Sequence, residues 1–438
     1  MVVTAMSAQI EECLCPALFF CAPASGQGKT TITAGIARYH QQQGLDVRVF
    51  KTGPDYLDPL ILEAASGKPV VQLDLWMVGE ERCKAILYEA AQEADLILIE
   101  GVMGMFDGKP SGADMAEYFG IPIAIVIDAR SMAQTFAALA VGLSTFRPEL
   151  KISGVIANSV GSDRHKQLIT DAMPSNLAIL GYMRRTEDAQ LPERHLGLVR
   201  PQEQHDIDIR LDRIATVVHE AGLTALPNNV YFRNGTVESI TPQLQDRTIA
   251  VARDDAFCFV YAANIKLLED MGATCVFFSP LANEPMPKCD ALWLPGGYPE
   301  LHHRRLAANQ LTMESIRTHH RNEKPILAEC GGMLYIMQTL TDVEGHQEKM
   351  SGLIPGDGIM RTRGGCQGMQ YAGFSVGEFR AHAHHRTRCE NALEPIAFGR
   401  RTRHPAPGEP IYEYNGIFAS YLHLYFLSNP TAIAKLFG

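Results

Sequence analysis

Short apolar runs alternate with longer amphipathic stretches along the first half of the chain. We expect buried strands at residues 17–22, 47–51, 96–100, 123–128 and 152–158. Apolar side chains at helical spacing predict helices at residues 30–43, 80–94, 133–146 and 206–222. An alternation of strands and helices indicates a parallel sheet wrapped by helices.

The same rhythm restarts in the second half. Strands are predicted at residues 248–253, 275–279, 291–294 and 325–328, with helices at 264–271 and 311–321. Residues 224–247 are poor in periodicity and rich in Asn, Gly and Pro, so we predict a linker there. The pattern therefore predicts an N-terminal extension (1–16), a first α/β domain (17–223), the linker (224–247) and a second α/β domain (248–438).

Composition narrows the class of partner. Of the 438 residues 46% are hydrophobic and 20% charged, and the formal net charge is −10. Without a long basic run, neither a nucleic acid nor an anionic membrane is expected as a partner. No apolar run approaches the ~18 residues of a membrane span. Ten scattered cysteines favour a reducing compartment, and the first 15 residues lack the basic start of a signal peptide. We expect the cytoplasm.

A glycine-rich loop lies between the first predicted strand and the first predicted helix, where a phosphate-binding loop is expected. Its residues are Ser25, Gly26, Gln27, Gly28, Lys29, Thr30 and Thr31. Backbone N–H groups of such a loop close around phosphate oxygens at a helix N-terminus. Lys29 is expected to reach the β- and γ-phosphates of ATP, and Thr30 to hold Mg²⁺. The strict pattern has Gly at position 23, where this chain has Pro23.

Two acidic segments, 51–59 and 100–108, follow later strands. Ligands of open α/β sheets bind at the carboxyl ends of strands, so these loops should converge on the nucleotide. Glu100 closes an apolar strand and, with Asp55, is a candidate Mg²⁺ ligand. Lys51 is a candidate for neutralising a phosphorylated carboxylate. Asp58 and Asp107 are further candidates for metal or substrate contacts.

Cys330 lies between a predicted strand and the Gly331-Gly332 pair, on a sharp turn that lifts a side chain clear of the backbone. A helix starting there is expected to lower the pKa of the thiol and favour the reactive thiolate. The amides of Gly297 and Gly331 are candidates for an oxyanion hole. His423 is the candidate base.

Three histidines, His382, His384 and His385, form a cluster. A metal site would need ligands at helix or hairpin spacing with acids or thiols nearby. We interpret the cluster as a surface or substrate-side loop rather than a metal site.

Seven motifs in order resemble those of the cobyrinate (or hydrogenobyrinate) a,c-diamide synthase family from residue 18 to residue 426. They are SGQGKTT (25–31), FKTGPDYLDP (50–59), EGVMGMFDG (100–108), PERHLGL (192–198), LPGGYPE (294–300), AECGG (328–332) and SYLHLYF (420–426). The resemblance implies a P-loop NTPase-like domain, similar to dethiobiotin synthetase, fused to a class I glutamine amidotransferase-like (flavodoxin-like) α/β domain.

The implied chemistry uses both domains. Cys330, with His423 raising its nucleophilicity, releases ammonia from glutamine. ATP and Mg²⁺ phosphorylate a corrinoid acetate group in the first domain, and ammonia displaces the phosphate. By motif position, Asp55, Tyr56, Leu57, Asp58, Glu100 and Asp107 are the expected substrate and metal contacts. A homodimer is left open as the assembly.

The sequence departs from the family at a few positions. Residues 381–385 read Ala-His-Ala-His-His where Gly-His-Glu-Phe-His is common, and Leu75 stands where Pro is common. Leu424 and Tyr425 follow His423, so the His-x-Glu pair of most Cys–His–Glu amidotransferases is absent, an absence that the cobyrinate family shares, and another group must orient His423. Three alternatives stay open: the same chemistry on hydrogenobyrinate or Ni-sirohydrochlorin, a partition-type ATPase that switches partners, and an uncoupled glutaminase.

Overall fold

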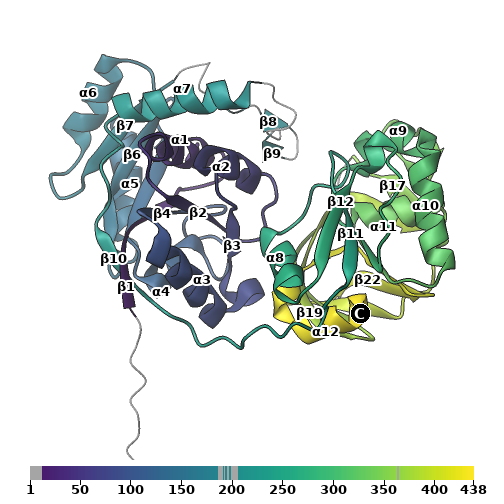
Figure 1. Cartoon of the computed structure of the whole chain (residues 1–438). Coiled ribbons are helices and arrows are strands. Elements are labelled where there is room, and N and C mark those ends of the chain that lie inside the picture. Colours follow the sequence, from purple (N-terminus) through teal and green to yellow (C-terminus); the bar gives the residue numbers. More distant parts are fainter. Residues whose placement is uncertain (1–11, 186–190, 192, 195–196, 199–205, 363–364) are drawn as a thin grey trace, which may run out of the picture. The chain divides into compact units, whose positions relative to one another are not determined.

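The computed structural model describes residues 12–185, 191, 193–194, 197–198, 206–362 and 365–438. The chain forms two compact units, which divide between Val237 and Glu238 (Figure 1). Within the described ranges, no helix is both long and apolar enough to cross a membrane.

The first unit is built on one sheet of mostly parallel strands. Its order is β3 (Val71–Leu73), β2 (Val47–Thr52), β4 (Leu96–Glu100), β1 (Glu12–Cys21), β5 (Ile123–Asp128), β6 (Ile152–Val160) and β7 (Ile179–Arg184). All five residues of β4 are buried, as expected for a strand covered by helices on both faces. The predicted parallel sheet is confirmed.

Helices cover both faces of this sheet. They are α1 (Lys29–Gln42), α2 (Asp58–Ser66), α3 (Glu80–Glu93), α4 (Gly112–Phe119), α5 (Thr135–Thr145), α6 (Asp163–Ala172) and α7 (Ile207–Glu220). Figure 1 shows α1, α2 and α7 on one side and α3 and α4 on the other. At Gly35 of α1 a Cβ would lie 2.6 Å from side-chain carbons of Ile214 and Val218, so this glycine lets α7 pack closely.

The strand β10 (Asn229–Arg233) lies inside the segment predicted as a linker. It pairs antiparallel with residues 12–16 of β1, the residues predicted as an extension. Both predictions missed this pairing because an edge strand with alternating exposed and buried side chains has weak periodicity. The compact first unit therefore continues through β10 instead of ending at residue 223.

The second unit contains a larger mixed sheet. Its order is β12 (Thr274–Phe278), β11 (Thr248–Ala252), β13 (Ala291–Leu294), β14 (Ile326–Glu329), β23 (Ile417–Ser420), β22 (Pro407–Tyr414), β21 (Ala397–Arg401), β18 (Cys366–Phe374), β19 (Gly377–His385) and β24 (Leu422–Leu424). The part from β12 to β23 is parallel, as predicted, and the rest is antiparallel.

Two hydrophobic clusters line this sheet. One includes side chains of α10 (Gln310–Arg321) and α11 (Gly331–Ile336). The other includes side chains of α8 (Ala262–Asp270) and α12 (Pro430–Phe437). The second unit also contains α9 (His303–Ala308) and a small sheet of β16 (Gln347–Lys349), β15 (Thr339–Thr341), β17 (Asp357–Met360) and β20 (Thr387–Glu390).

Candidate functional site

The predicted phosphate loop connects β1 to α1. Gly28 precedes the helix with φ 89°, a left-handed conformation that favours glycine. The amide of Asn158, on β6, donates to the carbonyl of Gln27 at 2.9 Å. A Cβ at Gly28 would lie 2.2 Å from that amide nitrogen, so the close approach also requires glycine. Asn158 lies at the end of a predicted strand, and nothing in the sequence around it indicates that it supports the loop.

Lys29 and Thr30 point from the first turn of α1 toward the acidic loops. The ammonium of Lys29 donates to the carbonyl of Met103 at 2.9 Å, and burial lowers its pKa. The hydroxyl of Thr30 lies 2.7 Å from Glu100 Oε1 and 3.3 Å from Asp58 Oδ2. The structure therefore brings the phosphate loop and the two acidic loops together, as expected from their places at strand ends.

A buried lysine lies within a cluster of three acids. Lys51 Nζ lies 2.7 Å from Asp58, 2.8 Å from Glu100 and 3.7 Å from Asp55. Burial opposes its charge, but the three carboxylates raise the pKa of Lys51. Burial and the neighbouring Asp58 raise the pKa of Asp55. Despite its own burial, the pKa of Asp58 is lowered by Lys51.

This acid cluster fits a magnesium ion. Glu100 Oε2 is buried and accepts no hydrogen bond from any described residue. Three carboxylates against one ammonium leave a net negative charge, and oxygen is the ligand that Mg²⁺ prefers. The hydroxyl of Thr30 lies within hydrogen-bond distance of the carboxylates of Glu100 and Asp58 and adds a further oxygen to the cluster.

The other predicted substrate contacts flank this cluster. Tyr56 and Leu57 are buried just before α2, where Asp55 Oδ1 accepts from the N–H groups of Leu57 (3.0 Å) and Asp58 (3.2 Å). Asp107 accepts from the N–H of Gly104 at 3.2 Å and so stabilises the turn of its own loop. The 192–198 motif lies outside the described residues except for the short strands β8 (Glu193–Arg194) and β9 (Gly197–Leu198).

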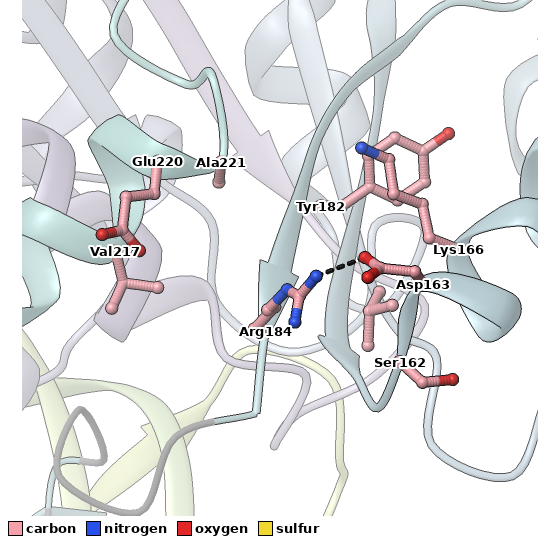
Figure 2. Close-up of a pocket in the computed structure, with 9 residues that line it drawn as sticks. Ser162, Asp163, Lys166, Tyr182, Arg184, Val217, Glu220 and Ala221 are labelled. Carbon is pink, nitrogen blue, oxygen red and sulfur yellow. Dashed lines mark hydrogen bonds and ion pairs between the residues drawn. The ribbon is translucent and has the colours of Figure 1, made fainter.

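A pocket of about 170 Å³ lies among β6, β7, α6 and α7 (Figure 2). An ion pair between Arg184 and Asp163 borders it, and Lys166 lies over the ring of Tyr182. None of the residues singled out from the sequence lines this pocket.

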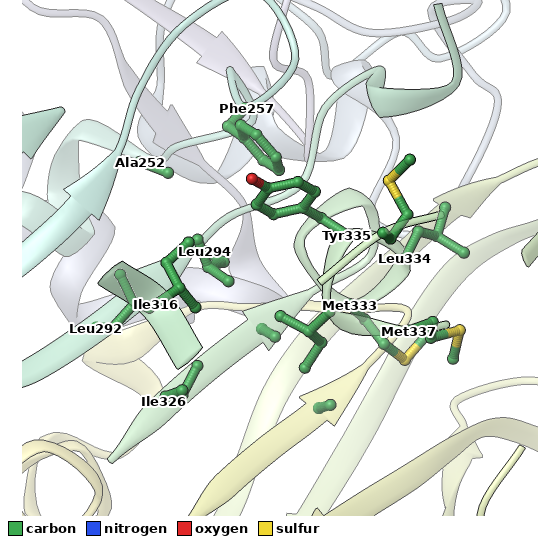
Figure 3. Close-up of a cluster of buried hydrophobic side chains, with 14 of the residues drawn as sticks. Ala252, Phe257, Leu292, Leu294, Ile316, Ile326, Met333, Leu334, Tyr335 and Met337 are labelled. Atoms are coloured by element: carbon green, nitrogen blue, oxygen red, sulfur yellow. The ribbon is translucent and has the colours of Figure 1, made fainter. Parts of the chain in front are cut away.

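Cys330 stands on a strained turn between β14 and α11. Its φ of 47° and ψ of −105° lie outside the usual regions for a residue with a side chain, at a cost of about 1–3 kcal/mol. Its N–H donates to the carbonyl of Ser420 at 2.7 Å. Met333, Tyr335 and other apolar side chains of α11 anchor the turn in the core (Figure 3). The predicted sharp turn is confirmed.

The two predicted Gly-Gly turns meet at this position. A Cβ at Gly331 would lie 3.0 Å from the nitrogen of Gly297. One at Gly297 would lie 2.1 Å from the carbonyl oxygen of Ala256, and one at Gly332 would lie 2.0 Å from that of Leu294. Only glycines permit this approach, which places the backbones of Gly297 and Gly331 next to each other.

His423 lies on β24 and is fully buried. A Cβ at Gly296 would lie 2.1 Å from its Cε1 atom, and the Phe259 ring lies 5.7 Å from its ring centre. In register with His423, on β19, lies His382. Gly296 and this cross-strand neighbour limit how the imidazole can turn.

Glu329, directly before Cys330, fixes the strand that carries His423. Its Oε1 accepts from the N–H of Leu424 at 2.8 Å, and its Oε2 accepts from the indole of Trp293 at 2.9 Å. The buried side chain of Glu329, which precedes Cys330, is thus hydrogen-bonded to the backbone of Leu424, which follows His423. Glu329 is a functional residue without a role predicted from the sequence, although an acid at the end of an apolar strand is a visible signal.

Burial keeps the titratable groups of this site neutral. Burial, and then the nearby charge of Glu300, raise the pKa of the Cys330 thiol far above its usual range. Burial lowers the pKa of His423 well below that of a free imidazole. The prediction of a lowered thiol pKa is wrong, because α11 has only six residues and burial outweighs its effect.

The histidine cluster is not a surface loop. His382, His384 and His385 lie on β19, and His382 is 4% exposed. Burial lowers the pKa of His382 to about 3. The ring of His385 stacks on Tyr421 with centroids 3.7 Å apart. The prediction of a loop is wrong, because residues 377–385 pair with β18 as an antiparallel strand; the substrate-side position stays a prediction.

Comparison with known proteins agrees with this division into two sites. Residues 18–199 match the CobQ/CobB/MinD/ParA nucleotide binding domain, and residues 248–431 match the CobB/CobQ-like glutamine amidotransferase domain.

Three relatives match nearly the whole chain. A hydrogenobyrinate a,c-diamide synthase of Stutzerimonas stutzeri is 51% identical over 422 residues, 96% of this chain and 98% of that protein. One of Pseudomonas aeruginosa is 48% identical over 96% of this chain and 97% of its own. A cobyrinate a,c-diamide synthase of Herminiimonas arsenicoxydans is 46% identical over 95% of each chain. The chain therefore belongs to the hydrogenobyrinate and cobyrinate a,c-diamide synthase family.

Proposed function

We propose that this enzyme amidates the a- and c-acetate carboxylates of cobyrinate in cobalamin biosynthesis, with ATP and glutamine as co-substrates. The observation that carries the proposal is the presence in one chain of a phosphate loop facing an acid cluster and of a cysteine on a strained turn. An ATPase that only switches partners has no use for the second of these sites, and the family of the chain does not favour it.

In the first unit, the carboxylate oxygen attacks the γ-phosphorus of ATP, which gives an acyl phosphate and ADP. Ammonia then attacks the carbonyl carbon, and phosphate leaves with formation of the amide. The phosphate loop, residues 25–31, binds the nucleotide, with Lys29 near the β- and γ-phosphates. Lys51, Asp58, Asp107 and the buried pair Tyr56 and Leu57 are proposed to face the corrinoid.

A magnesium ion would be held by Thr30, Asp55 and Glu100. When bound, it supplies positive charge to the phosphate oxygens. Lys51 holds Asp55, Asp58 and Glu100 close together, so the oxygen atoms are in place before any ion arrives.

In the second unit, Cys330 Sγ attacks the side-chain carbonyl of glutamine as its proton passes to His423. The N–H groups of Gly297 and Gly331 stabilise the oxyanion. His423 returns the proton to the departing ammonia, and water then hydrolyses the thioester to glutamate. Burial keeps the imidazole neutral before the reaction, so it can act as the base, although the same burial makes the proton transfer from sulfur uphill.

The test is an amidation assay with three acceptors side by side: cobyrinate, hydrogenobyrinate and Ni-sirohydrochlorin. We expect diamide formation from a cobyrinate-type ring, dependent on ATP and on glutamine or ammonia. Preference for the metal-free ring would move the assignment to hydrogenobyrinate. Failure on all three acceptors, with ATP hydrolysis intact, would overturn the proposal. A homodimer remains a prediction, which light scattering can measure.

A further inference from the structure

Three side chains of the metal-ligating type meet on neighbouring strands of the second unit. Cys366 opens β18 and lies in register with His385, which ends β19. Glu409 lies on β22. The sulfur, an imidazole nitrogen and a carboxylate oxygen of these residues all lie within 4.8 Å of one another. This is a hairpin with an acid and a thiol, the arrangement that a metal site requires.

The hydrogen bonds of His385 direct a lone pair into this group. Its Nδ1 lies 3.0 Å from the carbonyl of Thr387, which only accepts, so Nδ1 carries the proton. Its Nε2 then has a lone pair and lies 3.1 Å from Glu409 Oε2. This nitrogen is buried, and the carboxylate of Glu409 is the one ion-pair partner that it has among the described residues. Two acceptors therefore face each other, which a cation between them, or a second proton on the ring, would relieve.

The surroundings are those of a metal ligand set. Side chains of His385 and Glu409 are 6% and 9% exposed, while Cys366 is half-buried and leaves one side open. Cys366 Sγ receives the amide of Gln370 at 3.6 Å and the guanidinium of Arg401 at 3.5 Å. In metal sites, N–H donors to the sulfur and a carbonyl that accepts from the other histidine nitrogen hold the ligands in position and adjust their affinity for the metal.

We propose that Cys366, His385 and Glu409 bind a divalent transition-metal ion, with Zn²⁺ as the best match to one sulfur, one nitrogen and one oxygen donor. Three protein ligands leave a fourth tetrahedral position for water on the open side of Cys366. The site differs in place and in donor type from the all-oxygen magnesium site proposed for the first unit.

The metal would stiffen the end of β19 next to the reactive cysteine. The carbonyl of His384, the neighbour of the ligand His385, lies 3.9 Å from Cys330 Sγ. His382, on the same strand, lies in register with His423. Binding replaces the thiol proton of Cys366, which is released to solvent, so the affinity should rise with pH.

The experiment uses the full chain, stripped with a chelator and then dialysed against Zn²⁺ or Co²⁺. We expect one equivalent of metal by elemental analysis and a thiolate-to-cobalt charge-transfer band. Cys366→Ser should remove the band, and Glu409→Gln should weaken binding at least 10-fold. Cys275→Ser, at a half-buried thiol on β12, is the matched control and should keep one equivalent.

Three results would overturn the proposal. They are metal-free protein after dialysis, a full equivalent retained by Cys366→Ser, and loss of the metal on Asp342→Asn, which probes the exposed group of Asp342, Glu344 and His346. If the ligand variants do not fold, the cobalt band of the unaltered chain decides alone, because its absence excludes a thiolate ligand. None of these measurements depends on amidation, so they are independent of the proposed function.

Discussion

The acid cluster of the first unit and the cysteine site of the second bury ionisable groups in opposite ways. Around Lys51 one ammonium lies within 3.7 Å of three carboxylates, and the charged forms of Lys51 and Asp58 are favoured, although burial raises the pKa values of Asp55 and Glu100. Around Cys330 the charges are suppressed, because burial raises the pKa of the thiol and lowers that of His423. Buried charges need partners, whereas buried neutral groups need only hydrogen bonds.

The difference suits the two reactions. A site that handles phosphates requires fixed charge before the substrate arrives. A site that attacks a neutral amide can stay neutral until a proton moves from sulfur to imidazole. Removing one ionisable side chain should therefore reduce stability in the first unit and reduce glutamine-dependent activity in the second.

The largest effect is expected from Cys330→Ala. Glutamine-dependent amidation should fall by at least about 10³-fold, because the nucleophile is absent. Ammonia-dependent amidation should remain, since it needs only the first unit. Assays with glutamine and with ammonium salts separate the two activities. Equal loss of both would show that Cys330 is structural and that the comparison between the units fails.

The next largest effect is expected from Lys51→Met. Removing the ammonium leaves the buried Glu100 and the half-buried Asp55 and Asp58 without compensation, which should cost roughly 3–5 kcal/mol of unfolding free energy. The loss of unfolding free energy should become smaller as the pH is lowered, because the three acids then take up protons. Trp76 is the only tryptophan of the first unit, so urea unfolding can follow its fluorescence in a Trp293→Phe background.

The control for this experiment is Lys84→Met, which removes the exposed pair with Glu81. It should cost less than about 1 kcal/mol. A similarly small cost for Lys51→Met would mean that the acids are already protonated, and the contrast drawn between the two sites would be wrong.

A smaller effect is expected from Gly296→Ala. The new methyl group would lie 2.1 Å from His423 Cε1 and must displace the imidazole. Glutaminase kcat should fall by about 10²-fold, as for other misplacements near 1 Å, with ammonia-dependent amidation unchanged. Gly373→Ala on β18 is the matched control, since no atom lies within 4 Å of its added Cβ. Unchanged glutaminase activity in both variants would argue against His423 as the base.

The last prediction concerns Glu329 and pH, where the effect is spread over several pH units. Burial raises its pKa to about 8 against two N–H donors that lower it. In the unfolded chain its pKa is about 4.3. Between these values the folded state holds a proton that the unfolded state has lost, so stability falls as pH rises through this window, by up to about 1.4 kcal/mol per pH unit.

The pH effect can be measured by urea unfolding followed by Trp293 in a Trp76→Phe background, at pH values across that window. Glu329→Gln should flatten the slope, and Glu314→Gln, on the exposed side of α10, should not. An unchanged slope in Glu329→Gln would show that the carboxylate stays ionised, like the acids around Lys51.

Most of the parallel part of both sheets was predictable, because buried strands such as β4 and β13 are continuous apolar runs between amphipathic helices. The meeting of Thr30 with Glu100 followed from their places at neighbouring strand ends. The antiparallel strands β18 and β19 were not predicted, because their faces are unevenly buried and carry Gly, His and Gln.

Protonation states and hydrogen bonds that depend on burial could not be predicted from the sequence either. Neither the neutral state of Cys330 nor the two hydrogen bonds of Glu329 can be read from neighbours in sequence. The neutral thiol and the hydrogen bonds both depend on strands that are far apart in the chain. Glu329 and Leu424, for example, are separated by 95 residues.

The pairing of β10 with β1 has a consequence for synthesis on the ribosome. Residues 12–16 emerge early, but their partner at 229–233 is made more than 200 residues later. Beyond β10, the N–H of Thr236 is fixed by Glu81 at the start of α3. The nascent first unit must therefore wait with one strand end unpaired until the ribosome has passed residue 236. A fragment that stops at residue 223 would keep that end open permanently, as a site for self-association.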